Sequence, residues 1–483
     1  MTLRVDDLRV STGGRRLVGP VGFTVEPGRP LVILGETGAG KSLIAQAVMG
    51  SLPRGLIASG AVSLDGARVD ALPRGAREAL WGRRIAILPQ EPWRALDPLM
   101  RNLSQVAETH AEVAGQDWAQ ARTLARADLA DLGLGAQAAA ARPGQLSGGM
   151  AQRVAFAAAT AAGARTLLAD EPTKGLDDAR RNDVARLLRR FVEGGGVLIA
   201  ITHDIAVARA LGGDVMILRD GEVLETGPSE RILSDPQSDY GRALVEADPE
   251  NWPFWTSTAA GAPVLAAEAI TVGRGGRALL GGLTFALREG ARIGVIGPSG
   301  LGKTSLLDTL AGLIEPMSGR LLRHGAGERP LAVQKLFQDP PAAFAPLATL
   351  AEQFRDLARR HGLVPQAIPA LMQRLGLAPE LLDRRPAQVS GGELQRLALA
   401  RVLALRPAAI LADEPTSRLD PVTQRNVMAV IGEAAEEAGA AVMLVTHNGA
   451  LAQRWAGTVL DLARHAVAAE GVVVQTPERA SAA

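Results

Sequence analysis

The chain has 483 residues, 47% of them hydrophobic, which is enough for roughly two to four domains with sizeable cores. Its 52 basic and 51 acidic residues nearly balance, so it carries no electrostatic footprint for nucleic acid, and having no cysteine it lacks disulfides and iron–sulfur clusters. The charged N-terminus lacks the apolar core of a signal peptide, and no apolar run reaches the ~18–20 residues that span a bilayer, so we expect no transmembrane span of its own.

A glycine-rich loop follows the apolar run 31–34, which predicts a buried strand, and an amphipathic helical pattern follows the loop. The loop reads Gly-x-x-x-x-Gly-Lys-Ser and comprises Gly35, Glu36, Thr37, Gly38, Ala39, Gly40, Lys41 and Ser42. In such a loop, backbone N–H groups and the helix dipole bind phosphate, the lysine reaches the β- and γ-phosphates, and the hydroxyl is an oxygen ligand for Mg²⁺. The pattern predicts a nucleotide-phosphate site.

Further motifs follow along the first half. Gln90 precedes Glu-Pro, and an alanine- and leucine-rich helical stretch occupies 96–149. Ser147, Gly148 and Gly149 begin another helix, whose N-terminal N–H groups form an anion site. Asp170 and Glu171 end an apolar strand, where a carboxylate can hold Mg²⁺ through water, although a solvated turn has the same pattern. His203 follows the apolar run 197–202, where a lone histidine is more often a strand cap.

The second half repeats every one of these motifs in the same order. The repeated residues are Gly297, Pro298, Ser299, Gly300, Leu301, Gly302, Lys303 and Thr304 of the loop, then Gln338, then Ser390, Gly391 and Gly392, then Asp413, Glu414 and His447. Two of the four lysines of the chain hold the loop position, so a glycine-rich turn that binds nothing is a remote alternative. A repeat this long indicates two homologous domains rather than a solenoid.

The domain limits follow from the repeat and from composition. We expect the first domain at 1–246, a linker rich in proline and small residues at 247–262, the second domain at 263–475, and a disordered tail at 476–483.

Each half resembles the nucleotide-binding domain of an ATP-binding cassette (ABC) protein, because the five motifs occur together and in order. The resemblance implies an α/β fold of tandem P-loop NTPase domains. Each domain would have a RecA-like parallel-sheet core, an antiparallel β edge and a helical subdomain.

The resemblance also implies the cofactors and the role of each motif. ATP would bind in the two glycine-rich loops, with Mg²⁺ held by the hydroxyl, the aspartate and the glutamine of each half. Glu171 and Glu414 would act as general bases, a role worth about 10²–10⁴ in rate. His203 and His447 would contact the γ-phosphate, and Gln90 and Gln338 would link metal and water to the helical subdomain. The two domains would pair within the chain, with Ser390 completing the site of Lys41 and Ser147 that of Lys303.

Two features depart from the family pattern. The aromatic residue that usually stacks on adenine is absent near Ser11 and near Arg274, although an arginine can stack as a planar cation. The two Ser-Gly-Gly motifs, which resemble the signature motif of the family, continue with Met150 and Glu393 in place of the common glutamine. We still expect activity at both sites.

The peptide and nickel import branch of the family is the closest resemblance. Gln-Glu-Pro at 90–92 and Gln-Asp-Pro at 338–340 resemble its Q-loops, and 230–246, which contains Tyr240, resembles an element found after its first ATPase core. This implies ATP hydrolysis that drives import of a peptide, a nickel chelate or a related solute. The partners would be two membrane permease subunits and a solute-binding protein, at the cytoplasmic face of the inner membrane. The alternatives are a sugar-type tandem importer ATPase and a ribosome-associated tandem ABC ATPase.

Apolar residues after the two Q-loops are candidates for docking the permease. These are Trp93, Leu96, Leu99 and Met100 in the first half, and Phe344 and Leu347 in the second. The alternative is that they pack inside the helical subdomain.

Overall fold

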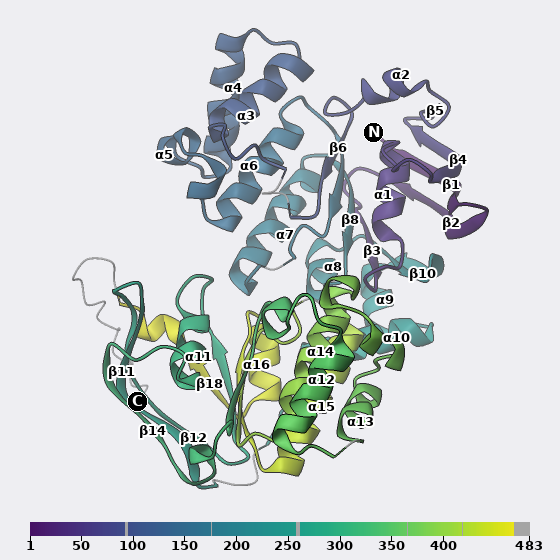
Figure 1. Cartoon of the computed structure of the whole chain (residues 1–483). Helices are drawn as coiled ribbons and strands as arrows, with labels where there is room; N and C mark the ends of the chain where they lie inside the picture. The colour runs from purple at the N-terminus through teal and green to yellow at the C-terminus, as the bar shows by residue number, and fades with distance from the viewer. Residues whose placement is uncertain (92–94, 175, 257–260, 365, 418, 468–483) are drawn as a thin grey trace, which may run out of the picture. The chain divides into compact units, whose positions relative to one another are not determined.

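The computed structural model describes all residues except 92–94, 175, 257–260, 365, 418 and 468–483. The chain divides into two compact units, Met1–Val245 and Glu246–Ala483 (Figure 1). The segment 247–262, expected as a linker, therefore belongs to the second unit, and the domain limits drawn from the sequence stay a prediction.

The first unit contains an antiparallel sheet and a mainly parallel sheet. The antiparallel sheet has the order β2 (Arg15–Val25), β1 (Leu3–Thr12), β4 (Ile57–Leu64) and β5 (Ala67–Arg68). The other has the order β10 (Glu222–Pro228), β9 (Asp214–Arg219), β3 (Leu31–Gly35), β8 (Val197–Thr202), β7 (Thr166–Asp170) and β6 (Ile85–Leu88). From β9 to β6 all pairs are parallel, and β10 pairs antiparallel to β9.

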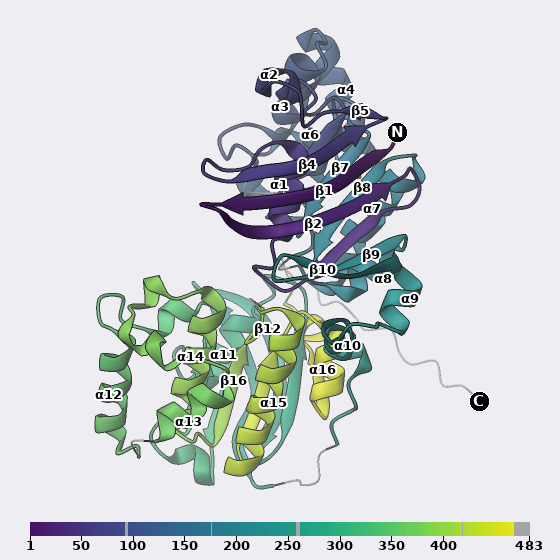
Figure 2. The same ribbon diagram turned by 90° about the vertical axis from the view of Figure 1, so that its right-hand side faces the viewer.

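Burial explains the two kinds of strand. β1 alternates buried and exposed residues, as a sheet with one wet face does, whereas β3, β7 and β8 are buried at every position, as parallel strands covered on both faces are. Figure 2 shows β4, β1 and β2 lying across α1 (Lys41–Met49), and a shared apolar core joins them.

The remaining helices of the first unit follow in chain order. They are α2 (Arg74–Glu78), α3 (Asn102–Glu108), α4 (Trp118–Asp131), α5 (Ala136–Ala140), α6 (Gly148–Thr160), α7 (Asp178–Glu193), α8 (Ile205–Leu211), α9 (Ser229–Ser234) and α10 (Asp239–Glu246). The helices α3, α4 and α5 pack together, and α3 and α4 also pack against α6, which gives the helical subdomain expected after Gln90.

The second unit repeats the arrangement. Its antiparallel sheet has the order β12 (Arg277–Arg288), β11 (Pro263–Arg274) and β14 (Ser318–Arg323). Its parallel sheet has the order β15 (Val333–Leu336), β16 (Ala409–Asp413), β17 (Ala441–Val445), β13 (Arg292–Ile296) and β18 (Thr458–Asp461). Its helices are α11 (Lys303–Ala311), α12 (Leu350–His361), α13 (Ala367–Arg374), α14 (Gly391–Ala404), α15 (Pro421–Ala438) and α16 (Gly449–Trp455). The predicted parallel core with an antiparallel edge is confirmed in both units.

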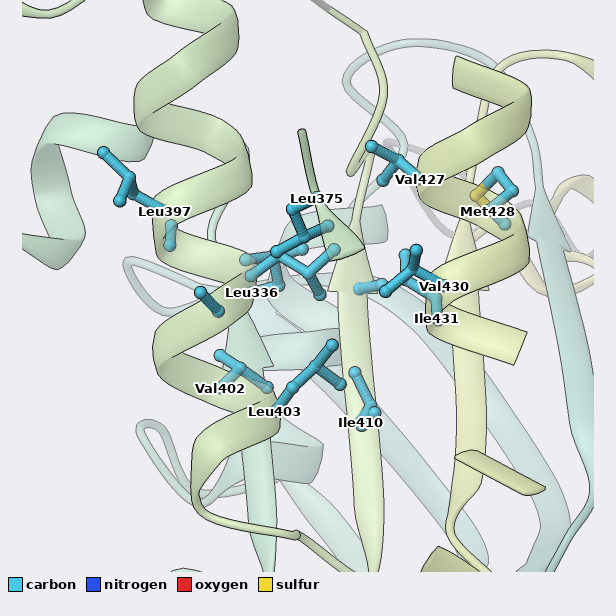
Figure 3. Close-up of a cluster of buried hydrophobic side chains, with 14 of the residues drawn as sticks. Leu336, Leu375, Leu397, Val402, Leu403, Ile410, Val427, Met428, Val430 and Ile431 are labelled. Atoms are coloured by element: carbon cyan, nitrogen blue, oxygen red, sulfur yellow. The ribbon is translucent and has the colours of Figure 1, made fainter. Parts of the chain in front are cut away.

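Apolar side chains of α14 and α15 meet over β16 in the core of the second unit. Figure 3 shows Leu397, Val402 and Leu403 on α14, with Ile410 on the strand and Ile431 on α15. This core fixes the two helices that begin beside the motif loops.

The start of the segment expected as a linker packs on the second unit. The Arg292 guanidinium lies between two indole rings, 4.4 Å from the Trp255 centroid and 4.6 Å from the Trp455 centroid. It also pairs with Glu436 at 2.6 Å, and Trp252 is buried nearby. Residues 252–255 therefore form part of this unit's packed surface.

The apolar residues after the Q-loops differ in burial, and Met100 is half-buried. Leu96 and Phe344 are buried, and Phe344 stands edge-on to Phe354 with centroids 6.4 Å apart, so the docking prediction is wrong for these two. Leu99 is 79% exposed and Leu347 is 81% exposed. Both lie nine positions after the Q-loop glutamine of their half. Trp93 lies outside the described residues, and no described helix has the length and apolar character to cross a membrane.

Leu397→Ala should lower the free energy of unfolding of the second unit by about 2–5 kcal/mol, since it leaves a cavity in the apolar core of that unit. Leu347→Ala is the matched control and should stay within about 0.5 kcal/mol of wild type, because this side chain is exposed. Urea unfolding of both variants measures the difference. Equal losses would show that the core assignment is wrong.

Candidate nucleotide site

The two glycine-rich loops connect a central strand to a helix, β3 to α1 and β13 to α11. Gly38 and Gly40 have φ of 92° and 94°, and Gly300 and Gly302 have φ of 83° and 107°. Side chains rarely adopt this left-handed region, and a Cβ on Gly40 would overlap Val18. The glycines are thus required by the path of the loop, which turns backbone toward the helix N-terminus.

The loop lysines are buried and held by their own loops. Lys41 Nζ donates to the carbonyls of Gly35 and Glu36 at 2.7 and 2.8 Å. Lys303 Nζ donates to the Gly297 carbonyl at 2.7 Å. Lys41 Nζ also lies 3.9 Å from Glu171 Oε1. A buried ammonium at a helix N-terminus is suited to bind a polyphosphate.

An aspartate ends the neighbouring strand in each unit, Asp170 on β7 and Asp413 on β16. Burial raises the pKa of each aspartate, although a hydrogen bond from Ser42 or Thr304 acts in the opposite direction. Among the described residues, Asp170 Oδ1 and Asp413 Oδ2 are buried without a hydrogen-bond partner. A buried carboxylate oxygen beside a hydroxyl is a donor set that fits Mg²⁺.

The glutamate after each aspartate has a strained backbone. Glu171 has φ of 48° and Glu414 has φ of 49°. Their N–H groups donate to the Ile201 carbonyl at 2.8 Å and the Val445 carbonyl at 3.0 Å, on the next strand. A side chain in this region costs on the order of 1–3 kcal/mol, and such strain is concentrated at functional sites.

A histidine contacts each glutamate. His203 Nδ1 lies 2.9 Å from Glu171 Oε2, and His447 Nδ1 lies 3.5 Å from Glu414 Oε2. Burial alone would raise the pKa of Glu171, but the His203 and Lys41 charges outweigh it, and the pKa is lowered. Burial alone would lower the pKa of His203, but the Glu171 carboxylate raises it. The glutamate is therefore held as a carboxylate.

The two Q-loop glutamines differ. Gln338 Nε2 donates to Glu414 Oε2 at 3.1 Å, so the structure brings it into the second site. Gln90 is exposed after β6, and no hydrogen bond between described residues joins it to Glu171.

The signature serines cap helices. Ser147 Oγ accepts from the Met150 N–H at 3.4 Å, and Ser390 Oγ accepts from the Glu393 N–H at 3.3 Å. Glu393 accepts in return from the Ser390 N–H at 3.0 Å, which closes a capping box that methionine at 150 cannot form. Methionine at 150 therefore removes a capping box that the common glutamine could close, whereas Glu393 keeps one. Both serines are exposed, and no described hydrogen bond joins either one to the glycine-rich loop of its own unit.

The sequence analysis missed a glutamine in each signature helix. Gln152 Nε2 donates to the Pro172 carbonyl, and Gln395 Nε2 donates to the Glu414 carbonyl at 3.1 Å. Each ties its helix to the loop that carries the strained glutamate. Their identical place, five residues after the signature serine, was the available sequence signal.

Comparison with known proteins agrees with this geometry. The pattern of the ABC transporter family matches residues 18–174 and 280–417. The peptidoglycan transport ATP-binding protein YejF of Agrobacterium fabrum is 31% identical over 92% of this chain and 88% of its own. The glutathione import ATP-binding protein GsiA of Escherichia coli K12 is 30% identical over 89% of this chain and 79% of its own. The structure titled RNase-L Inhibitor has a TM-score of 0.66 at 21% identity, over 94% of this chain and 87% of its own, which shows a shared fold.

The His203–Glu171 pair should stabilise the first unit in a pH-dependent way. The raised pKa of His203 adds stability that is lost as pH rises through that pKa, and the lowered pKa of Glu171 adds stability that is lost as pH falls through it. In a double-mutant cycle of His203→Ala and Glu171→Gln, the coupling free energy should be on the order of 1 kcal/mol larger at about pH 6 than at about pH 9. Urea unfolding at both pH values measures it, and a pH-independent coupling would contradict the assignment.

Proposed function

The chain belongs to the ABC transporter family as an ATP-binding subunit that hydrolyses ATP, and we propose that it powers an importer for peptides or related small solutes. The observation that carries the proposal is a complete set of phosphate loop, aspartate, glutamate and histidine in each unit. The expected partners are two separate permease subunits and a solute-binding protein, and the expected location is the cytoplasmic face of the cell membrane.

The solute class rests on the relatives. One is named for peptidoglycan transport and the other for glutathione import, and both share about nine-tenths of this chain's length with it. Glutathione is itself a peptide, so both names favour a peptide-like solute for this chain. Import of a nickel chelate stays a prediction from the family branch.

Each motif residue of the two sites would have its own task in ATP hydrolysis. Lys41 and the loop N–H groups would bind and orient the β- and γ-phosphates. Glu171, aimed by its strained backbone, would accept the proton of the attacking water, and His203 would orient that carboxylate. In the second unit Gln338 adds a hydrogen bond to Glu414, which would hold the base in place.

Mg²⁺ would be held by Ser42 and Asp170 in the first unit and by Thr304 and Asp413 in the second. Bound there, it would neutralise charge on the phosphate oxygens. The buried oxygens Asp170 Oδ1 and Asp413 Oδ2 support this assignment.

Turnover tests the first part of the proposal. Lys41→Ala and Lys303→Ala should each lower ATPase turnover at least tenfold, because each removes an ammonium that binds phosphate. Arg74→Ala is the control, since it removes an exposed cation outside the motif loops, and it should retain most of the activity. Phosphate release by the purified chain measures the rates, and wild-type turnover in either loop variant would remove that loop from catalysis.

Co-purification tests the permease docking surface. Leu99→Glu together with Leu347→Glu should abolish co-purification with permease subunits, because a charge at an apolar interface is left desolvated and unpaired. ATP binding and the melting temperature should stay near wild type, since both side chains are exposed. Leu313→Glu, at another exposed leucine of 58% exposure, is the control and should leave the complex intact. An intact complex in the double variant would place the docking surface elsewhere.

A further inference from the structure

The two nucleotide sites differ at one position beside the metal-binding aspartate. Lys335 lies on β15 opposite Leu411 of β16, and Ile87 lies on β6 opposite Leu168 of β7. Since Leu411 and Leu168 each stand two residues before the strand-end aspartate, Lys335 and Ile87 occupy the same structural position. The second unit thus places a lysine where the first has an isoleucine.

Lys335 is held in place by charge and by burial. Its Nζ lies 2.6 Å from Asp308 Oδ1, and its side chain is only 4% exposed. The same Nζ lies 3.7 Å from Asp413 Oδ2 and 5.2 Å from the Phe337 ring centroid. Arg274 NH1 also reaches Asp308, at 3.7 Å from Oδ2. The ammonium is therefore fixed between two carboxylates, one of which ends β16.

The partner of the lysine is specific to the second unit as well. Asp308 stands five residues after Lys303 on α11, and the residue five after Lys41 on α1 is Gln46. The Gln46 Oε1 atom is buried without a hydrogen-bond partner among the described residues. Both members of the ion pair are thus replaced by uncharged residues in the first unit.

After Asp308, the carboxylate nearest to the Lys335 ammonium is Asp413, the residue that would hold the metal ion. Asp413 Oδ2 has no hydrogen-bond partner among the described residues, and the lysine charge approaches it from inside the unit. A fixed positive charge at that distance attracts the carboxylate and repels a cation that shares it, and burial weakens the screening by water.

We propose that Lys335 is a built-in counter-charge for Asp413, so that the second nucleotide site binds its divalent cation more weakly than the first. The proposal rests on the proposed function, because it takes both loops as ATP sites. Lys335 is not a metal ligand in this scheme; its charge offsets that of Asp413 and repels a cation bound there. The two sites of one chain would then differ in the divalent cation concentration at which nucleotide is held.

The experiment measures Mn²⁺ binding by electron paramagnetic resonance in the full chain, with a non-hydrolysable ATP analogue present. Lys41→Ala isolates the second site, and Lys303→Ala isolates the first. We expect half-saturation by Mn²⁺ at about tenfold higher concentration at the second site than at the first.

Paired exchanges supply the matched variants. Lys335→Ile with Asp308→Gln gives the second site the residues of the first, and should lower its half-saturating Mn²⁺ concentration to that of the first site. Ile87→Lys with Gln46→Asp makes the reverse exchange, and should raise the half-saturating Mn²⁺ concentration of the first site. The reverse exchange keeps the test open if the first pair fails to fold.

Equal Mn²⁺ affinity at the two sites, or exchanges that change neither value, would overturn the inference while leaving the ATPase assignment intact. Failure of the analogue to bind in either background would overturn the proposed function and this inference together.

Discussion

Parallel pairing brings the carboxyl ends of neighbouring strands to one edge of a sheet, and both nucleotide sites depend on that edge. In the first unit the order β3, β8, β7 places the glycine-rich loop, His203 and the Asp170–Glu171 pair at adjacent strand ends. The second unit does the same with β13, β17 and β16. Segments more than a hundred residues apart in the chain meet there because of strand order alone, with the helices covering the faces.

The edge also concentrates features that oppose stability. Lys41, Asp170 and Glu171 are buried in the first unit, Lys303 and Asp413 are buried in the second beside a half-buried Glu414, and each glutamate adopts a left-handed backbone. The hydrogen bonds from Gln152 and Gln395, the caps at Asp177 and Asp420, and the core over β16 hold these loops in place. A well-packed scaffold is therefore what keeps a strained catalytic loop in one conformation.

The sequence predicted the parts of each site that local chemistry defines. The glycine-rich loops, the acidic strand ends and the histidines stand in short patterns whose repetition removed ambiguity, and the parallel core with its antiparallel edge followed from the family resemblance. Contacts between distant segments were not predictable. Phe344 and Leu347 are both apolar and three residues apart, yet only the packing of Phe354 decides that one is buried and the other exposed. Lys335 likewise shows nothing unusual until β15 is placed beside α11.

The stacking around Arg292 has an optical consequence. Three of the six tryptophans in the chain, Trp252, Trp255 and Trp455, belong to one unit and gather where the early part of the connecting segment is packed. Indole emission depends on its surroundings, but the other three tryptophans, Trp81, Trp93 and Trp118, belong to the first unit, so emission of the whole chain reports on both units. An excised second unit that begins no later than Trp252 carries only the three gathered near Arg292, and their emission then reports on its folding without any attached dye.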